Sequence, residues 1–145
     1  MSDLVEFLRA RLDEDEAAGR AATPSPWSYN PGKVWLDGEA FESYDRSKGE
    51  EFVGHGGPSP FRGCVAATGP ADHAQSMADA AFIARHEPAR ALAEVDAKRR
   101  IIAEHHPVDP CDAHDASFQT VECDTLRLLA LPYADHRDYR EEWRP

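Results

Sequence analysis

The sequence predicts an α+β fold in which a small antiparallel sheet packs with about four helices. Residues 3–20 and much of 72–134 place apolar side chains at helical spacing, whereas residues 23–70 break into short β-like pieces separated by turns. The chain has 145 residues, a length that fits one domain. We therefore expect a single domain over 1–145 that ends in a charged tail over 135–145.

The first helix is predicted over residues 3–20. Ser2 suits the position that caps a helix N-terminus. The acidic residues 13–16 predict a solvated helix end. The buried face is predicted from apolar residues that share one side at helical spacing: Leu4, Val5, Phe7, Leu8 and Leu12.

The middle of the chain is predicted to form an antiparallel sheet of three to five strands within about residues 27–68. Asp37-Gly38 is typical of a tight hairpin turn between two short strands. Prolines and glycines around residues 55–60 predict a loop. The expected strands span residues 27–29, 33–36, 39–42, 51–54 and 62–68.

Three further helices are predicted in the C-terminal half. The first lies within 72–86 with Phe82 available for packing, and the second runs from Pro88 to about His105, because proline suits the first turn of a helix. The last helix runs from residue 124 or 125 to 133, and aromatic residues in the tail are expected to dock on the body. The buried stripe of the second helix is predicted to comprise Leu92, Val95, Ile101 and Ile102.

Composition and charge exclude several classes of protein. Asp and Glu number 27 against 16 Lys and Arg, which gives a formal net charge of -11. An acidic chain is a poor partner for nucleic acid, because phosphate binding needs a basic surface. No apolar run approaches the roughly 20 residues that span a bilayer. The first residues lack the pattern of a signal peptide, so we expect a cytoplasmic protein and no membrane partner.

A metal site is predicted where histidine and cysteine alternate around residues 105–123. Three cysteines without a secretion signal argue against a disulfide framework. Two residues separate Cys111 from His114, so one turn can direct both at one ion. Cys123 precedes a helix, where a thiolate is favoured electrostatically. Sulfur and nitrogen donors point to Zn²⁺ over Mg²⁺ or Ca²⁺. His105 or the adjacent His106 is expected to supply the fourth ligand.

The remaining histidines and one cysteine are assigned other roles. His55, His73, His86 and His136 have no potential ligand at short spacing, so we expect surface or capping positions. Cys64 lies in an apolar run and is expected to be a core residue of a strand.

A structural metal site is favoured over a catalytic one. The zinc deaminase pattern requires His-x-Glu, which the chain lacks, and neither the HExxH nor the GxSxG pattern occurs. Asp109, Asp112 and Asp115 could support a metal-dependent hydrolase, but with two thiolates available they are expected to tune charge instead.

The chain resembles a family of small uncharacterised proteins from actinobacteria and their phages, a domain of unknown function. The resemblance implies a histidine at the end of the long helix, a CxxC-like pair and the cysteine of a C-x-T-L-R segment. Carried over, it favours His105, Cys111, His114 and Cys123, with His114 where a second cysteine is usual. The matching segments are residues 3–16, 26–27, 82–90, 98–102, 123–127 and the tail Tyr133-Ala134-Asp135-His136-Arg137-Asp138-Tyr139-Arg140-Glu141-Glu142-Trp143-Arg144-Pro145.

The sequence leads to one main functional hypothesis and two alternatives. The main hypothesis is a non-enzymatic zinc-stabilised module that binds an unknown protein partner. One alternative is an acidic inhibitor or decoy, of the kind phages encode, that occupies a basic surface of a host protein. The other is the metal-dependent hydrolase.

Overall fold

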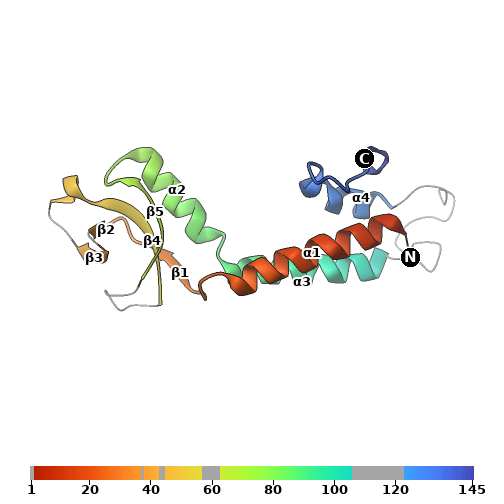
Figure 1. Ribbon diagram of the computed structural model, residues 1–145, viewed down its shortest axis with the longest axis horizontal. Helices are drawn as coiled ribbons and strands as arrows, with labels where there is room; N and C mark the ends of the chain where they lie inside the picture. The colour runs from red at the N-terminus through yellow and green to blue at the C-terminus, as the bar shows by residue number, and fades with distance from the viewer. Residues whose placement is uncertain (1, 37, 43–44, 57–62, 106–122) are drawn as a thin grey trace. The chain divides into compact units, whose positions relative to one another are not determined.

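The structure is a computed structural model that describes residues 2–36, 38–42, 45–56, 63–105 and 123–145 (Figure 1). Within these ranges the chain forms four α-helices and one five-stranded antiparallel sheet, which confirms the predicted α+β class. The chain divides into two compact units, a helical unit (residues 1–18 and 92–145) and a sheet unit (residues 19–91). The single domain stays a prediction, because compactness does not measure whether the units unfold together.

Strand β4 is the centre of the sheet unit. It pairs antiparallel with β1, β2 and β5, and β2 pairs with β3. Phe52 and Val53 on β4 are buried, as is Val34 on β2. The strands span β1 Trp27–Tyr29, β2 Lys33–Leu36, β3 Glu39–Glu42, β4 Glu50–His55 and β5 Cys64–Pro70.

The predicted hairpin joins β2 to β3. Lys33 pairs with Glu42 and Leu36 with Glu39, so the two strands are in full register. Gly38 has φ +86°, a left-handed conformation that glycine adopts without strain. Asp37, the other turn residue, lies outside the described residues.

Helix α2 (Ala74–Arg85) packs against β1, β4 and β5. Ser76 and Ala80 are buried, and the Thr68 hydroxyl donates to the Ser76 carbonyl oxygen at 2.7 Å. Gly69 has φ +132°, a backbone conformation that residues with a side chain rarely adopt, and an added Cβ would lie 2.6 Å from the Ser76 hydroxyl. The packing expected of Phe82 is wrong, because its side chain is 64% exposed on the face of α2 that points away from the buried residues.

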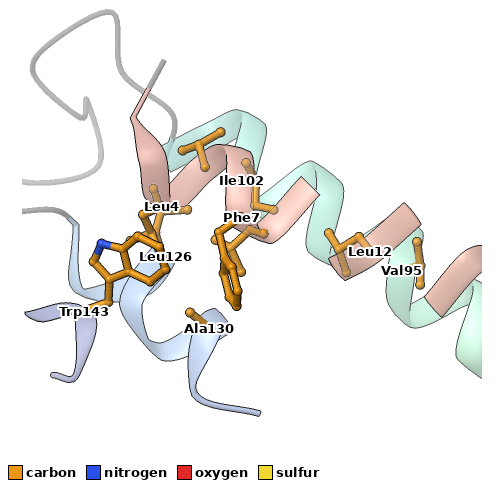
Figure 2. Packing of buried hydrophobic residues seen from close by; sticks show 10 residues of the cluster. Leu4, Phe7, Leu12, Val95, Ile102, Leu126, Ala130 and Trp143 are labelled. Atoms are coloured by element: carbon orange, nitrogen blue, oxygen red, sulfur yellow. The ribbon is translucent and has the colours of Figure 1, made fainter. Parts of the chain in front are cut away.

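The helical unit buries its core between α1 (Asp3–Ala21), α3 (Pro88–His105) and α4 (Asp124–Ala130) (Figure 2). The Ser2 hydroxyl accepts a hydrogen bond from the Val5 amide at 3.3 Å, as its capping role predicts. Val95 and Ile102 of α3 are buried, but Ile101 is 37% exposed, because one residue turns a helix by roughly 100°. The core comprises Leu4, Val5, Phe7, Leu8, Leu12, Val95, Ile102, Leu126, Ala130 and Trp143.

The tail docks on this core, as the sequence predicts. Trp143 is only 4% exposed, and its ring centroid lies 5.1 Å from that of Phe7. The guanidinium of Arg127 donates to the carbonyl oxygens of Trp143, at 3.2 Å, and Arg144. Burial of a large aromatic ring and a cation on the terminal carbonyls together hold the last turn, residues 141–143, in place.

The acidic run 13–16 is not simply a solvated helix end. Arg99 of α3 contacts Asp13 at 2.7 Å and Glu16 at 2.6 Å. The Tyr133 hydroxyl donates to Asp15 at 2.5 Å. These carboxylates therefore link α1 to α3 and to the start of the tail.

None of the helices in the described part of the chain is both long enough and apolar enough to cross a membrane.

Candidate metal centre

Two of the four predicted ligands lie next to each other. His105 is the last residue of α3, and Cys123 caps the N-terminus of α4. Their Nδ1 and Sγ atoms are 3.5 Å apart although 18 positions separate the residues in the chain. Both residues are half-buried.

The core of the helical unit sets this distance. Ile102 precedes His105 by three residues and Leu126 follows Cys123 by three, and both apolar side chains are almost completely buried in the same cluster (Figure 2). Residues three apart lie on the same side of a helix. Packing of Ile102 and Leu126 therefore brings the two helix ends, and with them the imidazole and the thiol, together.

The distance fits a shared zinc ion. With bonds of about 2.3 Å to sulfur and about 2.0 Å to nitrogen, tetrahedral angles separate the two donors by about 3.5 Å. The same distance suits a hydrogen bond between a thiol and an imidazole, in which one proton takes the position of the metal. The pair is thus arranged to share one cation, either a proton or a metal ion.

The other predicted ligands lie outside the described residues. These are Cys111 and His114, together with the alternative His106 and the acidic residues Asp109, Asp112 and Asp115. Among the residues that are described, no group of three His, Cys, Asp or Glu side chains gathers as a metal site would require. The four-ligand set accordingly stays a prediction, of which the structure describes one half.

The remaining histidines in the described ranges occupy other positions. His73 and His86 cap the two ends of α2. His136 accepts hydrogen bonds at Nδ1 from Arg11, at 2.8 Å, and from the Asp138 amide, at 3.1 Å. Two donors at Nδ1 place the proton of a neutral His136 ring on Nε2.

Cys64 lies on strand β5, as the sequence predicts, and is half-buried. Burial raises the pKa of its thiol, and the carboxylate of Glu50 raises it further. A thiol kept protonated in this way is a poor metal ligand.

A second polar cluster, in the sheet unit, is one that sequence reasoning missed. Glu51 on β4 is fully buried. Its carboxylate accepts hydrogen bonds from Arg46 Nη2 at 2.6 Å, from the Asp72 amide at 3.0 Å and from the Tyr29 hydroxyl at 3.2 Å. Arg46 also donates from Nε to the Asp72 carboxylate at 2.7 Å. The only signal in the sequence is that Glu51 directly precedes the apolar residues Phe52 and Val53 in a predicted strand.

This cluster is structural. Glu51 has three donors around it, and its charge is matched by Arg46 at the shortest of these distances. A buried carboxylate needs such a set of partners, because burial without them costs several kcal/mol. The cluster therefore links β4 to the 3-10 turn Arg46–Lys48 that precedes it and to the turn at Asp72 that follows β5.

Alkaline pH is expected to weaken the sheet unit through Tyr29. Burial, followed by the nearby Glu51 carboxylate, raises the pKa of Tyr29 to about 12. The phenol of the unfolded chain ionises at about 10, so the stability that this residue contributes is complete below pH 10 and disappears as pH rises toward 12. Urea unfolding between pH 8 and 11.5 should show a smaller alkaline loss in Tyr29→Phe than in the wild type; equal losses would contradict the assignment.

A family model matches all of residues 1–145. The chain belongs to DUF6221, a family of unknown function. No curated protein and no solved structure is significantly similar to it. Membership of DUF6221 brings no activity with it, so the chemistry of this protein is argued from its own residues.

Proposed function

We propose that this DUF6221 protein is a small zinc-binding domain that acts without catalysis, as a protein-interaction or accessory module. Its zinc ligands would be His105, Cys111, His114 and Cys123. The observation that carries the proposal is the 3.5 Å separation of His105 Nδ1 and Cys123 Sγ at the meeting point of two helix ends.

The donor set suits a structural site. Two thiolates and two imidazoles fill the four positions of a tetrahedral zinc ion and leave none for a water molecule or a substrate. Bound zinc would supply cross-linking, because it favours the folded state in which the ligands are close together. His105 and Cys123 hold the two helix ends, and the predicted pair Cys111 and His114 would approach from the segment between them.

The location of His105 supports it over His106 as the fourth ligand. His105 lies three residues after the buried Ile102, which directs its imidazole toward Cys123. Coordination through Nδ1 would leave the second ring proton on Nε2.

The alternatives are less well supported. An acidic decoy is supported by the net charge of -11 alone, and part of that charge is already paired within the chain, as at Glu16, which contacts Arg99. A hydrolase needs an open metal position, which four protein ligands do not leave. We therefore assign the module a protein partner, no nucleic acid and a reducing cytoplasm, in keeping with the resemblance to actinobacterial and actinophage proteins.

Metal analysis of matched cysteine variants tests this function. Protein produced with zinc and purified without chelators should contain about one zinc per chain by mass spectrometry, the stoichiometry of a single four-ligand site. Cys123→Ser and Cys111→Ser should lose the metal. Cys64→Ser should retain it, because Cys64 lies on a strand of the sheet unit. Wild-type protein without zinc, or equal loss in all three variants, would refute the proposal.

A further inference from the structure

The outer face of α2 carries an unusual aromatic pair. Phe82 is the most exposed large apolar side chain in the described part of the chain, at 64%. The imidazole of His86 stacks on its ring, with centroids 4.2 Å apart and planes 30° apart. His86 Nδ1 also lies 2.9 Å from the Phe82 carbonyl oxygen, so that the imidazole donates a hydrogen bond to it. The two rings are held as one rigid surface.

Rigidity distinguishes this pair from an ordinary exposed apolar residue. Single exposed apolar side chains are common and need no explanation. Aromatic side chains that are already ordered, however, lose little entropy on binding and are typical of the centre of protein interfaces. Exposed neighbours of small size, Ala78 and Ala81, leave room for an opposing side chain beside Phe82.

Charges on the same face are arranged symmetrically about Phe82. Asp79 lies three residues before it and Arg85 three residues after it, and both are exposed. Gln75 donates to the Asp79 carboxylate at 2.8 Å, which fixes the position of the acidic side chain. The face thus has an acidic end, an aromatic centre and a basic end.

Such a face is complementary to itself. When two copies of α2 pack antiparallel about a two-fold axis at Phe82, Asp79 of one copy lies at the level of Arg85 of the other, within reach of the long guanidinium side chain. The contact occurs twice, once on each side of the axis. The antiparallel helix dipoles also attract. A partner surface with charges of only one sign would instead be repelled by Asp79 or by Arg85, at one end of this face.

We propose that the outer face of α2 is a homodimer interface, with Phe82 and His86 at its centre and Asp79 paired with Arg85 of the second copy. The site is separate from the proposed zinc centre, and neither depends on the other. A contact about three helical turns long is small, so we expect a dissociation constant on the order of 10–100 μM.

Sedimentation equilibrium of the full-length protein tests the proposal between about 5 μM and 1 mM, a range that brackets the expected constant. Phe82→Ala should weaken association at least about tenfold, because it removes the central contact from both copies. Leu128→Ser is the matched control: Leu128 is 55% exposed on α4, and its replacement should change nothing. Circular dichroism checks that each variant is folded.

Charge-reversal variants test the proposed pairing of Asp79 with Arg85 of the second copy. Asp79→Arg and Arg85→Asp should each weaken association about tenfold, because each places like charges together. The double variant Asp79→Arg/Arg85→Asp should recover an affinity within about threefold of the wild type, since both pairs are then restored with reversed sign. A wild-type monomer at 1 mM, a dimer insensitive to Phe82→Ala, or a double variant no stronger than the single ones would overturn the proposal.

Discussion

Removal of the proposed zinc ion is expected to lower the free energy of unfolding of the helical unit by about 3–4 kcal/mol. His105 and Cys123 are 18 residues apart in the chain. A metal ion that joins them lowers the entropy of the unfolded chain, so less entropy is lost on folding. Cross-links over loops of this length contribute about 3 kcal/mol. Free zinc at a thousand times its dissociation constant stabilises the bound state by about 4 kcal/mol. Thermal unfolding followed by circular dichroism, with and without a chelator, measures the loss.

The loss of stability on metal removal should be confined to the part of the helical unit near Cys123. Helix α4 is joined to the core mainly through Leu126 and Ala130, and its Arg127 holds the carbonyls of the tail. Without the metal, amide hydrogen exchange should therefore accelerate over residues 123–145, while the amides of β4 keep their protection. Cys123→Ser should reproduce this pattern without a chelator. Equal acceleration in both units, or none in either, would contradict a local metal cross-link.

Replacement of Arg46 by leucine is expected to cost about 3–5 kcal/mol, the usual result of leaving a buried charge without its partner. Glu51 is fully buried, and Arg46 supplies its only cationic partner in the described residues, at 2.6 Å. Tyr29 and the Asp72 amide would still donate to the carboxylate, but neither neutralises its charge. Urea unfolding of Arg46→Leu at pH 7 measures the effect.

A double-mutant cycle separates the buried charge from ordinary packing. Glu51→Gln removes the charge and preserves the size of the side chain, so Arg46→Leu/Glu51→Gln should recover at least about 1 kcal/mol relative to Arg46→Leu. Arg100→Leu is the control, because Arg100 is 79% exposed and its pair with Asp96 contributes less than about 0.5 kcal/mol. If the double variant is less stable than Arg46→Leu, the burial of Glu51 is not the cause.

The sequence pattern predicted correctly those helix and strand bounds that depend on residues close together in the chain. Helix α3 begins at Pro88 and ends at His105, as predicted, because proline suits the first turn and an apolar stripe persists to that point. The first three strands also match their predicted bounds, since alternation and turn residues are properties of neighbouring positions. His105 and Cys123 lie together because both residues directly adjoin apolar stripes that share one core, whereas their role as zinc ligands stays a prediction.

Which side of a helix or strand is buried depends on tertiary contacts, and the sequence did not reveal these. Phe82 has the periodicity of a packing residue, but the sheet takes the face of α2 that carries Ser76 and Ala80. Glu51 is buried because Arg46 and Asp72 approach it from two different turns, which no spacing in the chain reveals. A pattern shows which residues share a side of an element, and only the fold shows what that side contacts.

The coordination of zinc in the intact protein tests the central proposal most directly. X-ray absorption at the zinc edge of the purified full-length chain should show two sulfur neighbours at about 2.3 Å and two nitrogen neighbours at about 2.0 Å, the signature of a closed Cys₂His₂ site. Cys64→Ser should give the same spectrum. A shell of oxygen and nitrogen without sulfur, or five or six neighbours that include water, would contradict a structural site formed by His105, Cys111, His114 and Cys123.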